Sequence, residues 1–264
     1  MNRAALRWPL HAFDVHRLRL ASGAVMWVYI AAHFTNHALG LISLDAAEAG
    51  LRIAVSVWQS LPGTALLYGA FTLHVLLALY GLHQRRTLRL PPAELARIAF
   101  GLTIPLLLVG HVLSTRIAYE WYGDAVKYSR VVANLMRDGN TGWQLALLAP
   151  GWLHGCMGLN VGLRHRAWYR RWRRALLALA VALPLLAAAG YGALLRDVAA
   201  LDGHATAVAP TPESAAQRRE ALRGLRVELL GGYFGALALV LGARMWRLRR
   251  DARRAPAGAD DAAR

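Results

Sequence analysis

Hydrophobic and polar positions alternate along this chain on a scale of about twenty residues, not on the scale of a strand or an amphipathic helix. Six mostly apolar stretches are separated by polar or basic segments: 20–42, 64–83, 98–118, 143–163, 175–195 and 227–243. A hydrocarbon core about 30 Å thick is crossed by roughly 20 apolar residues in a helix. Backbone groups in lipid must also bond within their own segment. The pattern therefore predicts an all-α polytopic membrane protein, a bundle of six transmembrane helices.

Charged residues are divided between the two sets of connections. Arginines collect in segments 3–19, 85–97, 164–174 and 247–254. The opposite connections hold most of the acids: Asp45, Glu48, Glu120, Asp124, Asp138, Asp197, Asp202, Glu213 and Glu220. Because cytoplasmic loops are enriched in Lys and Arg, both termini are expected in the cytoplasm. We expect a basic cytoplasmic segment at 1–19, a membrane domain at 20–250 and a disordered tail at 251–264.

Composition agrees with a membrane protein. The 264 residues include 31 Lys and Arg against 15 Asp and Glu, which gives a net charge of +16. Such a basic chain could suggest nucleic acid, but the mean hydropathy is +0.31 and the arginines lie in loops. We therefore expect anionic membrane lipids as partners and no nucleic acid. The single cysteine, Cys156, excludes a disulfide scaffold.

Histidines inside the apolar stretches are the most informative residues. The first stretch contains His33 and His37, and the next three contain His74, His111 and His154, whereas the last two contain none. An ionisable side chain at membrane depth is costly and usually functional. Haem iron is held by axial histidines, and facing helices can supply one each. Four such helices could hold two haems.

Other residues fit the same interpretation. Small residues would let a flat macrocycle approach the backbone, and they occur on the second to fourth stretches: Gly69, Gly81, Gly101, Gly110, Gly151, Gly155 and Gly158. Aromatic residues that could line a haem include Trp27, Phe34, Phe71 and Trp152. Arg116, at the outer end of the third stretch, could pair with a haem propionate.

Two other interpretations of the histidines remain open. A histidine between helices can be a plain hydrogen-bonding group, and transporters use chains of ionisable residues as proton relays. The apolar stretches contain almost no Asp or Glu for such a relay. The function classes that compete are thus a haem protein, a haem-free membrane anchor or receptor, and a small transporter.

Four motifs resemble a known bacterial family. They are HFTNHALGLISL (33–44), PGTALLYGAFTLHVLLAL (62–79), GLTIPLLLVGHVLSTR (101–116) and WLHGCMGL (152–159). They are similar to the six-helix membrane anchor of class III adenylate cyclases. That anchor is itself similar to the cytochrome b subunit of succinate dehydrogenase and fumarate reductase. The resemblance covers about 19–174. No iron–sulfur cysteine cluster or cyclase domain follows in this sequence, so we expect no cyclase activity from the chain itself.

The resemblance implies a ligand set and a location. It pairs His74 with His154, and His111 with His37 or His33, of which His37 is slightly favoured. It implies two b haems, electron transfer or quinone-linked redox sensing, and the bacterial inner membrane. A soluble signalling or redox partner on the cytoplasmic side is also expected. Tyr119 and Glu120 are considered for a quinone site but not assigned. By helical rise, His74 and His154 should lie near the middle of the bilayer and His111 toward its outer side.

Overall fold

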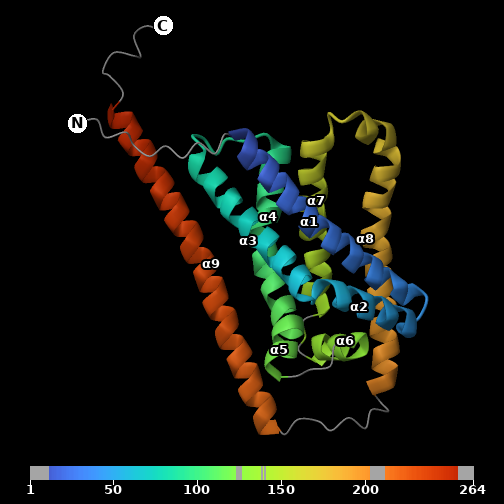
Figure 1. The fold of residues 1–264 in the computed structure, drawn as a ribbon. Coiled ribbons are helices and arrows are strands. Elements are labelled where there is room, and N and C mark those ends of the chain that lie inside the picture. The colour runs from blue at the N-terminus through green and yellow to red at the C-terminus, as the bar shows by residue number, and fades with distance from the viewer. Residues whose placement is uncertain (1–11, 123–126, 138, 140, 203–211, 255–264) are drawn as a thin grey trace.

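The computed structural model describes residues 12–122, 127–137, 139, 141–202 and 212–254, and this part of the chain is helical without any strand (Figure 1). The elements are α1 (Ala12–Ala38), the 3-10 turn η1 (Leu39–Leu41), α2 (Leu44–Trp58), α3 (Leu61–Gln84), α4 (Pro92–Val112), the π-helical turn η2 (Leu113–Ile117), α5 (Ala118–Tyr122), α6 (Tyr128–Arg137), α7 (Thr141–Leu163), α8 (Ala167–Asp202) and α9 (Pro212–Arg254). The predicted all-α class is confirmed for these residues.

Four helical segments are long and apolar enough to cross a membrane. They are Leu61–Gln84, Pro92–Tyr122, Ala167–Ala200 and Ala216–Arg254, and they contain the second, third, fifth and sixth predicted stretches. The first stretch lies in α1 and η1 and the fourth in α7, and these helices are not among the four segments. Polar side chains interrupt both stretches: His33, Asn36 and His37 in α1, and Gln144, His154 and Asn160 in α7.

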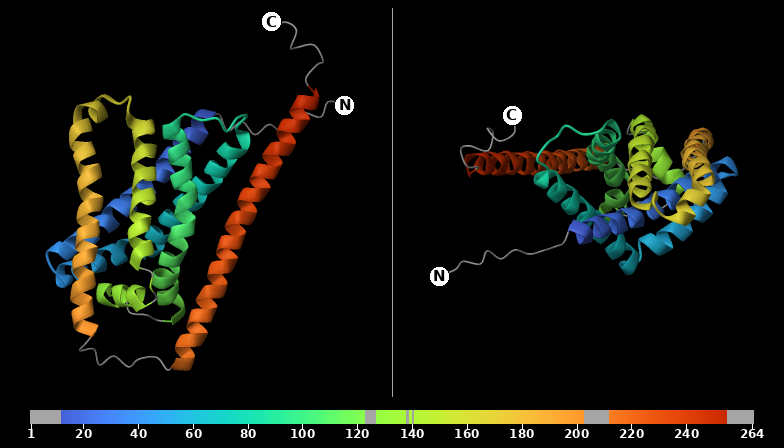
Figure 2. Two further views of the ribbon diagram at one scale, coloured as in Figure 1. Left: turned by 180° about the vertical axis from the view of Figure 1, so that it is seen from behind. Right: turned by 90° about the horizontal axis from the view of Figure 1, so that it is seen from above.

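Helices α1 and α7 each contact several other helices. Helix α1 packs against α2, α3, α7 and α8, and α7 also packs against α4 and α8. Seen from above, α9 stands at one side, where it contacts α3 and α4 (Figure 2). Two of the buried polar residues, Ser22 and Asn36, belong to α1. Polar residues therefore lie on helices that other helices cover.

Helices α1 and α8 meet backbone to backbone at two glycines. A Cβ on Gly190 of α8 would lie 2.1 Å from the carbonyl oxygen of His37, and a Cβ on Gly40 would lie 2.6 Å from the carbonyl oxygen of Gly190. Real side chains do not fit at such distances, so both positions require glycine. Small residues at helix interfaces allow this close approach in membranes. The contact holds the end of α1 that carries His33 and His37.

Basic segments gather at one end of the molecule. The α3–α4 connection, the α7–α8 connection and the last turns of α9 all lie at the top in Figure 1. Arg244 donates to the carbonyl oxygens of Arg85 and Arg86, at 2.9 and 3.0 Å, and Arg247 donates to that of His83 at 2.9 Å. Arg85 also pairs with Glu94. The predicted grouping of arginines at one end is thus observed, while residues 1–11 lie outside the described part.

Helices at both chain ends extend beyond their predicted apolar stretches. Helix α9 has 43 residues, about 65 Å at 1.5 Å per residue, roughly twice the hydrocarbon thickness. Its polar first part lies beside α5, where the Arg218 guanidinium is 4.7 Å from the centre of the Tyr122 ring. The disordered tail was expected from Asp251, but residues 251–254 continue α9. The remainder of that tail, 255–264, lies outside the described residues.

Replacing Gly190 with alanine should lower the free energy of unfolding by about 1–3 kcal/mol, because the added methyl group collides with the α1 backbone. The measurement is thermal unfolding of the detergent-solubilised protein. The matched control is Gly192→Ala, two residues along the same helix, where a Cβ meets nothing within 4 Å. Equal effects of the two substitutions would contradict the close contact between α1 and α8.

Candidate functional site

His74 and His154 face each other across the bundle. His74 belongs to α3 and His154 to α7, and their ring centroids lie 6.1 Å apart with the ring planes at 85°. Both side chains are half-buried. Metal–imidazole bonds are about 2.0–2.1 Å long, so facing ring nitrogens must be about 4 Å apart to share one metal. Two imidazoles whose nitrogens point at each other across that gap have ring centres about 6 Å apart, and the observed centroid distance of 6.1 Å matches this value.

Hydrogen bonds fix which nitrogen of each ring is available. The Nδ1 of His74 lies 3.1 Å from the carbonyl oxygen of Arg19, and the Nδ1 of His154 lies 2.9 Å from that of Arg97. A carbonyl oxygen only accepts, so both Nδ1 atoms carry the proton and donate. Each Nε2 therefore has a free lone pair, the arrangement that orients metal-ligating histidines.

Glycines make room for these two rings. A Cβ on Gly101 of α4 would lie 2.7 Å from Cε1 of His154, and one on Gly23 of α1 would lie 3.2 Å from Cε1 of His74. Of the glycines singled out in the sequence, Gly101 is the one that meets an imidazole. A Cβ on Gly155 would instead meet the Trp27 ring, and one on Gly81 would approach Arg19. A Cβ would meet nothing within 4 Å at four others: Gly69, Gly110, Gly151 and Gly158.

A second group of histidines lies farther along the same helices. His33 of α1 and His111 of α4 have ring centroids 5.7 Å apart, with ring planes at 74°. His111 donates from Nδ1 to the Gln144 side-chain oxygen of α7 at 2.6 Å, which leaves its Nε2 free. His33 lies ten residues beyond Gly23, and His111 ten beyond Gly101, so the two groups are separated by about 15 Å along each helix.

His37 occupies a different place from His33. Its Nε2 lies 3.0 Å from the Nε2 of His33, and its Nδ1 is hydrogen bonded to the hydroxyl of Tyr128. Burial raises the pKa of the Tyr128 phenol, so the hydroxyl keeps its proton and can donate to Nδ1. His37 would then donate from Nε2 to His33. The ring contact with His111 is made by His33, although the sequence slightly favoured His37 as its partner.

Glu48 of α2 anchors the helix that carries Tyr128. The backbone N–H groups of Tyr128 and Ser129 donate to the Glu48 carboxylate at 2.9 and 3.0 Å, and the Ser129 hydroxyl donates at 3.0 Å. An anion at a helix N-terminus satisfies free N–H groups and the helix dipole. The carboxylate thus positions Tyr128 beneath His37.

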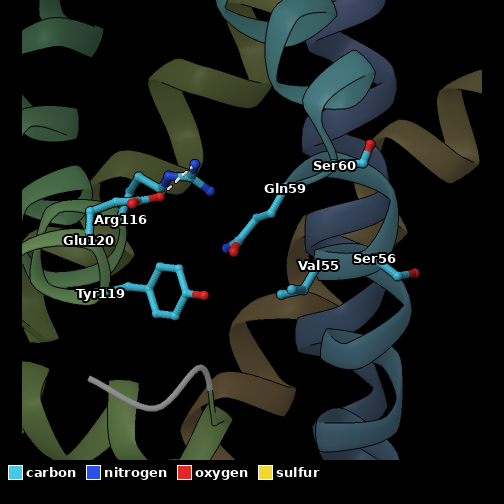
Figure 3. Close-up of a pocket in the computed structure, with 7 residues that line it drawn as sticks. All are labelled: Val55, Ser56, Gln59, Ser60, Arg116, Tyr119 and Glu120. Carbon is cyan, nitrogen blue, oxygen red and sulfur yellow. Dashed lines mark ion pairs between the residues drawn. The ribbon is translucent and has the colours of Figure 1, made fainter. Parts of the chain in front are cut away.

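Arg116 lies away from both histidine groups' facing nitrogens, in the π-helical turn that follows His111. It forms an ion pair with Glu120 at 2.8 Å. Both line a cavity of about 380 Å³ with Tyr119 and four residues of the α2 end: Val55, Ser56, Gln59 and Ser60. Figure 3 shows Tyr119 and Gln59 pointing into the space between the two segments. This cavity brings Arg116 together with both residues considered for a quinone.

Aromatic rings connect these places. Trp27, Trp152 and Phe34 stack between the two histidine groups, with centroid distances of 5.4 and 5.2 Å. Tyr29 lies 6.0 Å from His33 and 5.2 Å from Trp58, which precedes the cavity residue Gln59. Ring contacts therefore lead from Trp58, the neighbour in sequence of a cavity residue, through Tyr29 to His33.

The sequence missed several partners of the predicted residues. Gln144 lies 33 residues from His111, and Tyr128 lies 91 residues from His37. Glu48 lies 80 residues from Tyr128, which it positions. No local spacing in the sequence reveals contacts between residues so far apart. Gln144 could have been noticed as a polar residue in an apolar stretch. The His74–His154 group also lies nearer the basic end than the helical rise suggested, because its hydrogen-bond acceptors are the backbones of Arg19 and Arg97.

Within the described residues, no group of three or more His, Cys, Asp or Glu is arranged to hold a metal ion. A haem iron takes two axial ligands from the protein, which is what a facing histidine pair offers. Comparisons with protein-family models, curated proteins and solved structures found no match to this chain.

Replacing Glu48 with glutamine should accelerate amide hydrogen exchange at Tyr128 and Ser129 by about tenfold, because a charged acceptor for both N–H groups is lost. Hydrogen exchange of the full chain in detergent, followed by mass spectrometry, measures it. Asp45→Asn is the control, since Asp45 is an exposed acid in the first turn of the same helix. Unchanged exchange in E48Q would refute the role of Glu48 in docking α6.

Proposed function

We propose that the chain is a dihaem cytochrome b-type membrane anchor that transfers electrons or senses the redox state of the quinone pool. The observation that carries this proposal is the pair of histidine groups, each built from two facing helices. Three of the rings donate from Nδ1 to a fixed oxygen and leave Nε2 free. Such a polarised, oriented imidazole is a good iron ligand and a poor structural filler in an apolar bundle.

In this proposal six helices cross the membrane. Helices α1 and α7 join the four most apolar helices, because they lie between them and expose few polar groups to lipid. Each is long enough, with 27 and 23 residues, about 40 and 35 Å. Their polar residues contact other helices, as Trp152 does by donating from Nε1 to the carbonyl oxygen of Ala180 at 2.7 Å.

In this proposal the basic end faces the cytoplasm, so both termini lie on that side. The membrane is the bacterial inner membrane, as the resemblance to the cyclase anchors implies. This orientation follows from the arginines gathered at the α3–α4 and α7–α8 connections. The soluble signalling or redox partner binds at that side. The partner and the likeness to cyclase anchors are supported by the four sequence motifs alone. No cyclase activity is assigned to this chain.

The residues divide the task of holding two haems. His74 and His154 would hold one iron, and the Arg19 and Arg97 carbonyl oxygens keep the two rings in place. His111 and His33 would hold the other, and Gln144 orients His111. Bound b haem supplies one-electron transfer. Iron ligation by His33 requires its Nε2 to release the bond to His37, which then stays attached to Tyr128.

Arg116 is the cation for a haem propionate or for a quinone oxygen at the cavity beside Tyr119. Glu120 holds the guanidinium at 2.8 Å, at the outer end of the bundle. A cavity of about 380 Å³ falls within the size of small-molecule sites. The ring contacts from Trp58 through Tyr29 to His33 make this the most direct place for electrons to enter or leave.

Purified full-length protein from haem-replete cells should contain about two b haems per chain. His154→Ala and His111→Ala should each reduce this to about one, because each removes an axial ligand of a different iron. Pyridine haemochrome assay and reduced-minus-oxidised spectra measure the content. His165→Ala, in the exposed α7–α8 turn, is the control and should leave two. Colourless folded wild-type protein would end the haem proposal.

The same assay separates His33 from His37. His33→Ala should lose about one haem per chain, whereas His37→Ala should keep about two and shift one reduction potential, because it alters hydrogen bonding around a ligand. The opposite pattern would assign ligation to His37. Tyr128→Phe serves as the comparison for His37→Ala, since it removes the hydroxyl bonded to that ring and no imidazole.

A further inference from the structure

A second cavity lies at the basic end of the molecule, between the last turn of α7 and the first turns of α8. It has a volume of about 310 Å³ and is lined by Asn160, Arg164, Tyr169, Arg170 and Arg173. Its nearest lining residue to a histidine group is Asn160, six residues after His154 on α7, or about 9 Å along the helix, and none of the five residues is one of the proposed haem ligands. Its walls are formed by two helices that the short α7–α8 turn joins.

The cavity is strongly cationic. Three of its five residues are arginines, and none is a carboxylate. In the described part of the chain, no Asp or Glu pairs with Arg164, Arg170 or Arg173, although other arginines at this end do find acids, as Arg85 and Arg97 find Glu94. Arg164 is held by donating from Nε to Nε2 of His165 at 3.1 Å. Uncompensated guanidinium groups around one space attract an anion.

The arrangement of the lining is fixed by a bond between the helices. The Tyr169 hydroxyl donates to the Asn160 side-chain oxygen at 3.2 Å. Arg164 follows the last residue of α7 and its N–H donates to the carbonyl oxygen of Asn160 at 2.9 Å, and Arg170 and Arg173 lie three apart on α8. Guanidinium groups bind phosphate oxygens through paired N–H donors. The chemistry of the cavity therefore favours an anionic ligand such as a phosphate over a neutral ligand.

The neighbouring surface is that of a membrane interface. Trp168 and Trp172 are exposed on an adjoining face of α8, and the Trp168 ring lies 5.8 Å from the Tyr169 ring. Tryptophan is enriched at the boundary between headgroups and hydrocarbon. One turn beyond Arg173, Leu177 is 64% exposed, and Leu153 on the Asn160 side of α7 is 42% exposed. Apolar surface thus continues from the cavity toward the middle of the bundle.

We propose that this cavity binds the phosphate of an anionic phospholipid, whose acyl chains lie along the exposed apolar faces of α7 and α8. The arginines contact the phosphate, and the tryptophans lie at the level of the glycerol. A free phosphate ion would use the same arginines but would leave the apolar track empty. The proposal rests on the membrane placement of the proposed function and does not depend on haem.

Native mass spectrometry of the full chain in detergent, titrated with phosphatidylglycerol and with phosphatidylcholine, tests it. Wild-type protein should retain one phosphatidylglycerol at least tenfold more tightly than phosphatidylcholine. The triple variant R164Q/R170Q/R173Q should lose about tenfold to a hundredfold in phosphatidylglycerol affinity, since each arginine near an anionic lipid contributes to binding. The control R166Q/R171Q/R174Q removes the same charge from the same segment outside the cavity and should change affinity less than threefold.

Equal losses in the two triple variants would overturn the proposal, because they would reflect net charge alone. Equal retention of the two lipids would overturn it too. Full displacement of the lipid by millimolar inorganic phosphate would assign the cavity to a free anion. If the triple variant does not fold, R173Q replaces it, together with quenching of tryptophan fluorescence by brominated phosphatidylglycerol. W168F/W172F should then reduce the quenching, and the seven other tryptophans account for what remains. Haem content, measured on the same samples, separates failure here from failure of the haem proposal.

Discussion

The structure depends on satisfying imidazole nitrogens inside an apolar bundle. A polar group buried without a hydrogen bond costs several kcal/mol in hydrocarbon, so the buried rings need hydrogen-bond partners. His74 and His154 use main-chain oxygens of Arg19 and Arg97, and His111 uses Gln144. Each bond joins two helices and fixes Nδ1 of one ring. The same interactions that hold the helices together therefore leave the Nε2 of these three rings available to bind a ligand.

This requirement explains which helices lie inside. Helices α1 and α7 carry three of the five histidines that lie in the apolar stretches and contact several other helices, while α9, whose apolar segment has no buried residue, lies at the edge (Figure 2). Gly40 and Gly190 bring α1 against α8 at the level of His37. The close packing and the histidine groups are therefore parts of one arrangement, because the backbone contact sets how far His33 reaches toward His111.

The apolar stretches and the histidines within them could be predicted from the sequence, because both are local properties of composition. The helix ends could not be predicted, because hydropathy marks only the apolar part of a helix. Backbone hydrogen bonding continues beyond that part in α8 and α9. The choice between His33 and His37 was also beyond the sequence. The two lie on one helix face, and their difference comes from Tyr128, which α6 brings in from 91 residues away.

Electron paramagnetic resonance of the oxidised, full-length protein tests the central claim most directly, since it reports the ligands of iron without any substitution. Two histidine pairs predict two low-spin ferric haems per chain, each with two imidazole ligands, and iron equal to about two atoms per chain by metal analysis. High-spin haem, a single haem, or folded protein from haem-replete cells without iron would contradict the account that these imidazoles face one another to hold haem.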